Sequence, residues 1–112
     1  MLISVVDHND RIKQGIALFA SGIMHAVLDN SITLDQAWNW LLNLHMLDYV
    51  ELVFGEDDVT NIIHLGTELE DVKRIIPDKF VQSCDTLIEL CKKVIQQTET
   101  SNLQNDYYLK II

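Results

Sequence analysis

A histidine in an acidic stretch is the part of this sequence that comes nearest to metal chemistry. The candidate ligands are His64, Asp57, Asp58, Glu68 and Asp71. His64 and Glu68 are four residues apart, as two ligands on one face of a helix would be. However, Gly66 and Thr67 are typical of a helix end and a new helix start, which would break that face. A metal-binding protein or metal-dependent enzyme is therefore the alternative hypothesis, and we assign no metal ligand and no cofactor.

The cysteines and the remaining histidines give little support to nucleophilic catalysis. Cys84 and Cys91 share the apolar side of a predicted helix, where burial disfavours the reactive thiolate. They lie about 10 Å apart along its axis, too far for a disulfide, which predicts free thiols in a reducing compartment, the cytoplasm. His25 precedes Asp29 by four residues, but we interpret His25 and His45 as buried core histidines. Since no catalytic motif occurs either, we predict no catalytic residue and no enzymatic activity.

The charges of the chain are distributed unevenly. Its 112 residues include 8 Lys plus Arg and 17 Asp plus Glu, for a net charge of -9. No Lys or Arg occurs between Lys13 and Lys73, and that interval holds ten of the acids. Phosphate recognition depends on Lys and Arg, so this balance argues against nucleic acid or an anionic membrane as a partner.

An acidic interval of this kind predicts a basic protein partner. A surface of one sign accelerates association and selects partners, although acids at helix starts and a solvated face are the simpler explanation. We predict a non-enzymatic interaction protein, such as an inhibitor or immunity factor for a nuclease toxin, whose carboxylates occupy a basic cleft in place of phosphates. Trp38 and Trp40 are two residues apart, so one core face cannot hold both, and Trp40 is a candidate anchor. The predicted partner-binding residues are Glu51, Glu56, Asp57, Asp58, Glu68, Glu70, Asp71 and Trp40.

The elements that must position these residues are predicted to be helices. Apolar residues make up 48% of the chain and charged residues 22%, which is typical of a globular protein, and the length fits one domain. We expect a single helical domain over residues 1–112, a compact all-α bundle of about five helices. Periodicity, caps and breakers predict helices over about 10–28, 33–47, 58–66, 67–76 and 78–98, with a further short start at Asp48 that stops at Gly55.

Some features of these helices predict close packing or association. Gly15, Gly22 and Ala26 form a small-residue seam that predicts a close helix crossing. The 33–47 helix is apolar almost all round, which predicts enclosure by neighbours or a homodimer. An apolar ligand pocket between the first helix and this one is a third hypothesis for function.

The two ends of the chain leave several alternatives open. Residues 1–6 are apolar and β-branched, so they predict either a strand or a helix lead-in. The tail from about residue 101 is polar and ends in Tyr107–Ile112, which could form a short terminal β-ribbon with residues 1–6, dock on the bundle or fray. The apolar run Ile16–Leu28 has 13 residues, fewer than a membrane span needs, so we expect a core helix.

The segment from Ile62 to Val72, which reads Ile-Ile-His-Leu-Gly-Thr-Glu-Leu-Glu-Asp-Val, resembles a family of small acidic bacterial proteins classed as a domain of unknown function. The resemblance runs from the helix containing Gly15 to Pro77 and does not reach the Cys84–Cys91 helix or the tail. It implies an all-helical, bacterial, cytoplasmic protein. It supplies no functional residues.

Overall fold

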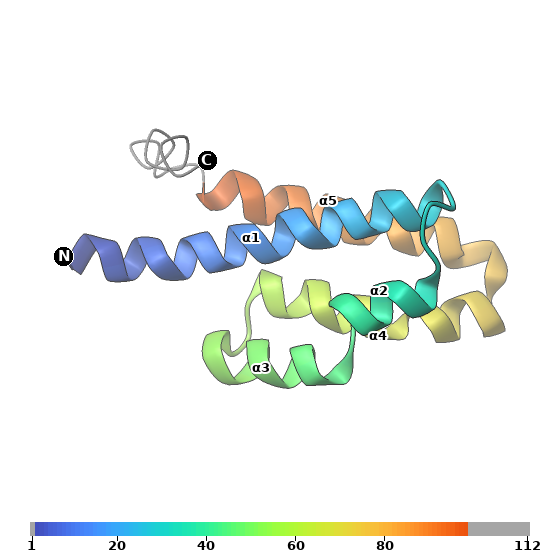
Figure 1. Cartoon of the computed structure of the whole chain (residues 1–112), viewed down its shortest axis with the longest axis horizontal. Coiled ribbons are helices and arrows are strands. Elements are labelled where there is room, and N and C mark those ends of the chain that lie inside the picture. The colour runs from blue at the N-terminus through green and yellow to red at the C-terminus, as the bar shows by residue number, and fades with distance from the viewer. Residues whose placement is uncertain (1, 99–112) are drawn as a thin grey trace.

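The longest helix, α1 (Leu2–Leu28), provides one side of the hydrophobic core. The computed structural model describes residues 2–98, with side chains over residues 9–97. Ile16, Ala20, Ile23 and Val27 recur at helical spacing along α1, and all four are buried. They face mainly α5 (Phe80–Thr98), which lies beside α1 and runs in the opposite direction (Figure 1).

The remaining helices cover the other side of the core. These are α2 (Leu34–Trp40), α3 (Leu44–Phe54), α4 (Asp58–Ile75) and the short 3-10 helix η1 (Pro77–Lys79). α4 packs against α5 and α3, whereas α2 contacts α1 and α4. The prediction of an all-α bundle of about five helices is confirmed, since residues 2–98 contain no strand. Residues 2–6 are helical, and the predictions for the tail concern residues outside the described range.

Several helix boundaries follow from local signals in the sequence. The Thr33 hydroxyl accepts a hydrogen bond from the Gln36 N–H at 3.1 Å, and the Gln36 side chain accepts one from the Thr33 N–H at 2.9 Å. This reciprocal capping box starts α2, as predicted. Pro77 follows the end of α4 and begins η1, again as predicted, because proline cannot continue the helical hydrogen bonding.

The predicted helix over residues 33–47 is wrong, because the chain breaks between α2 and α3. Asn43 causes the break because both the nitrogen and the oxygen of its side-chain amide form hydrogen bonds with the backbone. Its Nδ2 donates to the Trp38 carbonyl at 2.6 Å, and its Oδ1 accepts from the Met46 N–H at 2.8 Å. One side chain therefore closes α2 and caps α3, and the start expected at Asp48 falls within α3.

Two predictions about glycine are also wrong. α4 continues through Gly66 and Thr67, so the predicted stop and new capping box do not exist. Gly66 instead permits a close approach, because a Cβ there would lie 2.6 Å from Leu42 Cδ2. Gly15 and Gly22 are exposed, and a Cβ at either would meet nothing within 4 Å, so the predicted seam makes no helix crossing.

Among the described helices, none combines the length and the apolar character that crossing a bilayer requires.

Candidate functional site

The turn between α3 and α4 presents the acidic residues, and backbone capping fixes its shape. Gly55 ends α3 with φ of 65°, a left-handed conformation that glycine adopts without a steric penalty. Asp57 then caps α4 by accepting a hydrogen bond from the Val59 N–H at 3.0 Å. The buried Thr60 hydroxyl donates to the Gly55 carbonyl at 2.7 Å, which ties the first turn of α4 to the end of α3. The positions of the neighbouring acids are thus set by the fold.

Lys13 anchors this turn to α1. Its Nζ lies 2.8 Å from Asp57 Oδ2, with both side chains about three-quarters buried (25% and 26% exposed), and 5.3 Å from the centre of the Phe54 ring. Burial raises the pKa of Asp57, but the hydrogen bonds from Lys13 and from the Val59 N–H outweigh it, so the pKa lies below its ordinary value. Asp57 is therefore committed to holding the turn together.

Two more of the predicted partner-binding acids are paired with cations. Asp58 Oδ2 lies 3.4 Å from Lys93 Nζ on α5. Asp71 Oδ1 lies 2.8 Å from Arg74 on the next turn of α4, in an exposed pair. Glu70 is exposed but borders α2, close to Trp38, on a different side of α4 from Glu68. The structure thus does not gather all seven predicted acids on one face.

Two of the predicted acids, Glu51 and Glu56, remain near each other at the α3–α4 turn, whereas Glu68 lines a separate hollow between α4 and α5. Glu51 and Glu56 line an open depression of about 400 Å³ together with His64 and Asn61. Glu68 lies one helical turn beyond, with its Oε2 3.9 Å from His64 Nε2. Glu51 and Glu56 form no ion pair with any residue that the structure describes. This depression is a place where an added cation would find carboxylates not already neutralised by Lys or Arg.

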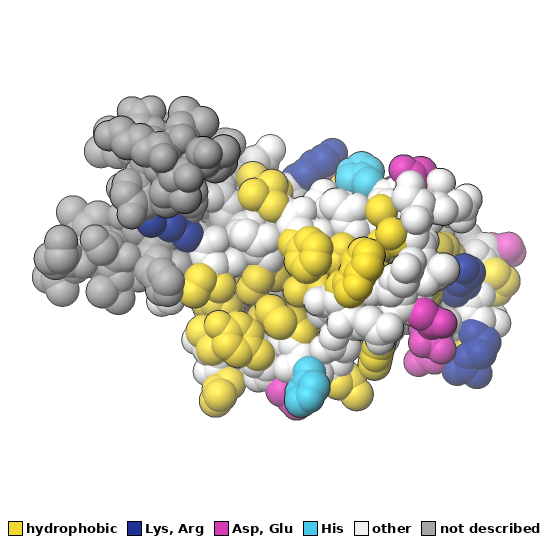
Figure 2. Space-filling view, viewed as in Figure 1, with side chains coloured by type: hydrophobic (Ala, Val, Ile, Leu, Met, Phe, Trp, Pro, Cys, Tyr) yellow, Lys and Arg dark blue, Asp and Glu magenta, His cyan; other side chains and the backbone are white. Residues whose placement is uncertain are grey.

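The outer face of α3 is apolar, which the sequence analysis did not identify. The exposed apolar side chains of α3 are Leu44, Tyr49, Leu52 and Val53. Leu52 is 86% exposed and directly follows Glu51. Figure 2 shows apolar side chains over the part of the surface that α3 forms. We call Leu44, Tyr49, Leu52 and Val53, with Glu51, Glu56 and Glu68, the α3 surface.

Trp40 stands at the far end of this surface from the acids. It is the last residue of α2 and is 52% exposed, while Trp38 is half-buried. The prediction that one core face cannot hold both tryptophans is confirmed. The exposed face of α3 could have been identified from the sequence by starting the helix at the Asn43 cap. The acidic residues Asp48 and Glu51 then show which side of the helix faces solvent.

The structure tests some of the alternative chemistries. Among the residues that it describes, no three His, Cys, Asp or Glu side chains come together in a group that could hold a metal. Metal binding stays a prediction, for metal analysis of the purified protein to test. His25 and His45 are exposed, so the prediction that they are core histidines is wrong.

The cysteines match the sequence analysis. Cys84 and Cys91 are free and buried. Burial raises the pKa of Cys84 to about 11 and that of Cys91 to about 12. At neutral pH both groups are thiols, which suits packing better than nucleophilic attack.

The described residues define an all-α bundle whose α3–α4 turn presents unpaired carboxylates beside an exposed apolar helix face. The chain belongs to the family described as "Protein of unknown function (DUF3969)", which matches residues 7–110. The predicted likeness to a domain of unknown function is confirmed, and the match extends through α5, beyond the Pro77 limit of the resemblance. No curated protein and no solved structure matches the chain.

Proposed function

We propose that this protein is a non-enzymatic interaction protein that binds a basic protein partner through the α3 surface. The observation that carries the proposal is that Glu51 and Glu56, unpaired with Lys or Arg among the described residues, adjoin Leu52, which is 86% exposed. An apolar side chain so exposed gains free energy when a partner covers it. The carboxylates beside it would select a partner with Lys or Arg at the matching positions.

The net charge of the whole chain also favours a basic partner. With a net charge of -9, the protein attracts a basic partner before contact and repels acidic proteins. The form of this function that we favour is an inhibitor or immunity factor, in which Glu51, Glu56 and Glu68 fill a cleft that normally holds phosphates. The free buried cysteines suit a reducing bacterial cytoplasm as its location.

The paired acids have a smaller part in this proposal. Asp57 and Asp58 hold α4 to α1 and α5 through Lys13 and Lys93, so their substitution would alter the fold as well as the charge. Glu70 faces α2 and lies apart from the depression. The proposal therefore rests on Glu51, Glu56 and Glu68, and Trp40 is an additional contact only if the partner spans α3.

Capture of a partner by the immobilised full-length protein tests the proposal. A lysate of the source organism is passed over the wild-type protein and over the double variant Glu51→Lys/Glu56→Lys, and bound proteins are identified by mass spectrometry. We expect a basic protein to be retained by the wild type and lost by the double variant. Leu52→Ala should weaken retention without changing the charge.

A matched variant separates a local effect from net charge. Asp35 and Asp85 are exposed acids on α2 and α5, away from the α3 surface, so Asp35→Lys/Asp85→Lys changes the net charge equally. This control should retain the partner. Equal retention by all variants, or equal loss from both double variants with both still folded, contradicts the assignment of the α3 surface.

A second copy of the chain is the other occupant to consider, because exposed apolar side chains on α3 also suit a homodimer. Light scattering after size exclusion distinguishes the two. A dimer that Leu52→Glu converts to a monomer would assign the α3 surface to self-association instead.

A further inference from the structure

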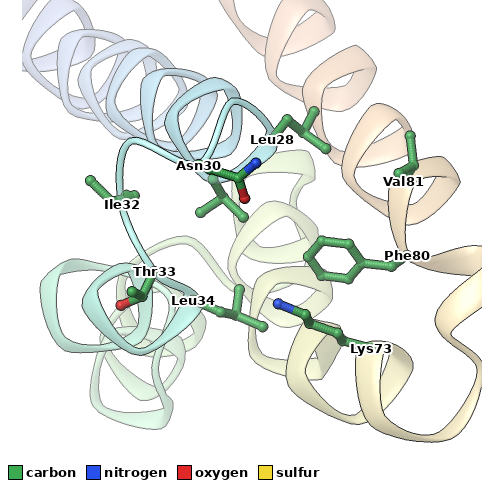
Figure 3. Close-up of a pocket in the computed structure, with 9 residues that line it drawn as sticks. Leu28, Asn30, Ile32, Thr33, Leu34, Lys73, Phe80 and Val81 are labelled. Carbon is green, nitrogen blue, oxygen red and sulfur yellow. The ribbon is translucent and has the colours of Figure 1, made fainter.

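A second hollow lies at the opposite end of the molecule from the α3–α4 turn (Figure 1). It has a volume of about 420 Å³, within the range of roughly 300–1,000 Å³ typical of small-molecule sites. Four segments meet there: the end of α1, the turn into α2, the last part of α4 and the start of α5. Figure 3 shows the side chains that line it.

Apolar side chains form much of the lining of this hollow, beside the polar Asn30, Thr33 and Lys73. Leu28 comes from α1, Leu34 from α2, and Phe80 and Val81 from α5. Val81 is 57% exposed although it lines the hollow, so apolar surface remains uncovered there. A ligand with an apolar body would remove this surface from water.

One cation, the ammonium group of Lys73, projects into this hollow. Lys73 is the only charged residue among those that line the hollow, and its Nζ lies 5.3 Å from the centre of the Phe80 ring. It forms no ion pair with a residue in the described range, whereas Lys13, Lys92 and Lys93 each pair with a carboxylate. In a chain with 17 acids, a hollow with an unpaired ammonium and no carboxylate in its lining would favour an anion over a cation.

A polar group accompanies the ammonium. Asn30 holds φ of 65°, and its carboxamide makes no hydrogen bond to another residue that the structure describes. Figure 3 shows the Lys73 ammonium between Leu34 and Phe80, with the oxygen of the Asn30 carboxamide on the same side and its nitrogen turned toward Leu28. The ammonium offers N–H donors to the oxygens of one acid group, and the exposed Asn30 carboxamide adds another after a half-turn that exchanges its oxygen and nitrogen.

We propose that this hollow binds a small organic acid, a monocarboxylate with an apolar body. One exposed ammonium supplies a single positive charge, which matches a monocarboxylate, and the apolar side chains beside it suit an apolar body. The carboxylate would meet Lys73 and Asn30, and the apolar body would lie against Phe80, Leu34 and Val81. The inference is independent of the proposed function, because it uses different residues at the other end of the bundle.

A comparison of three ligands with unbranched apolar chains of five or six carbons tests the sign of the preference. Hexanoate, its neutral amide hexanamide and the cation hexylammonium are each titrated into the isotopically labelled full-length protein and followed by amide NMR shifts. We expect hexanoate to bind most tightly and hexylammonium most weakly, with the largest shifts around Asn30, Lys73 and Phe80. Equal affinity for all three ligands, no saturable binding of hexanoate at millimolar concentration, or shifts centred elsewhere would overturn the proposal.

Variants then assign the interaction to the ammonium. Lys73→Met keeps the apolar stem and should weaken hexanoate roughly tenfold or more, as expected when one charge-assisted hydrogen bond is lost, while hexanamide binding stays the same. Asn30→Gly keeps the left-handed backbone and should weaken hexanoate several-fold. Lys79→Met removes an exposed ammonium from the adjacent η1 and should have no effect. Unchanged hexanoate binding by folded Lys73→Met contradicts the proposal, as does an equal loss in Lys79→Met.

Discussion

Gly66 lies inside α4 where the segment between α2 and α3 crosses it, and the substitution Gly66→Ala tests that contact. A Cβ at Gly66 would lie 2.6 Å from Leu42 Cδ2 and 3.0 Å from both Leu42 Cβ and Cγ. Leu42 is 1% exposed, so its side chain has little free space into which to move. The whole Leu42 side chain, and with it the backbone between α2 and α3, would have to shift.

The magnitude follows from two opposing contributions. Extra volume in a packed core costs about 1–3 kcal/mol, whereas Gly→Ala within a helix gains about 1 kcal/mol. We therefore expect Gly66→Ala to lower the free energy of unfolding by about 0–2 kcal/mol, toward the upper end because Leu42 has little room to move, with a fall in Tm of about 4–8 °C for each kcal/mol. Urea unfolding followed by circular dichroism measures the change.

Two controls isolate the contact with Leu42. Gly22→Ala adds the same methyl group at an exposed helical position with nothing within 4 Å, so it should raise stability by about 0.5–1 kcal/mol. In a Leu42→Ala background, Gly66→Ala should cost much less stability or none, because the contacts with Leu42 Cγ and Cδ2 are gone and only the 3.0 Å contact with Cβ opposes the helix preference. If Gly66→Ala stabilises the unmodified protein as Gly22→Ala does, the reasoning about this crossing is refuted.

Four further predictions concern the α3–α4 turn, the thiols and the α3 surface. Asp57→Ala removes a helix cap and leaves Lys13 unpaired, so unfolding free energy should fall by about 1–2 kcal/mol in urea. The pKa of Asp57 in the folded protein lies below its ordinary value of 3.8, so the ionised carboxylate stabilises the fold. The wild type should therefore be more stable than Asp57→Asn above about pH 4, and this difference in unfolding free energy should disappear as the pH falls through the folded-state pKa. A difference that grows in acid contradicts this. Cys84 and Cys91 should resist iodoacetamide in the native state and react in urea, as mass spectrometry would show, whereas rapid native labelling would contradict their burial. Leu52→Ala should change stability by less than about 0.5 kcal/mol, so any loss of partner capture would be direct, and a larger loss of stability would contradict its exposure.

Helix boundaries set by adjacent residues could be predicted from the sequence. The Thr33 capping box, the Gly55 stop and the Pro77 break each depend on groups within a few residues of one another. The amphipathic pattern of α5 likewise predicted its buried face, including Cys84 and Cys91. In these elements local chemistry and the fold agree.

One failure arises where a distant contact determines the structure, and another where a local helix cap was missed. Gly66 followed by Thr67 looks like a helix end, but the reason for glycine is the Leu42 side chain from another segment. Asn43 breaks an otherwise helical pattern without any glycine or proline nearby. The contact at Gly66 could not be inferred from spacing along the chain, whereas the Asn43 cap involves residues only three and five positions away.

The candidate site could be predicted only in part for the same reason. The acids were identified by type, yet their ion pairs join different helices: Lys13 of α1 to Asp57, and Lys93 of α5 to Asp58. Only the fold separates these structural acids from Glu51 and Glu56, which remain unpaired among the described residues. The hollow around Lys73 likewise forms from four segments that no local pattern connects.

The affinity of the captured partner for two charge-reversed proteins tests the central claim most directly. Isothermal titration would compare Glu51→Lys/Glu56→Lys with Asp35→Lys/Asp85→Lys, which carry the same net charge. We predict that the first variant binds at least about tenfold more weakly than the second, as the loss of two close charge contacts implies. Equal dissociation constants for the two folded variants would contradict a partner site on the α3 surface.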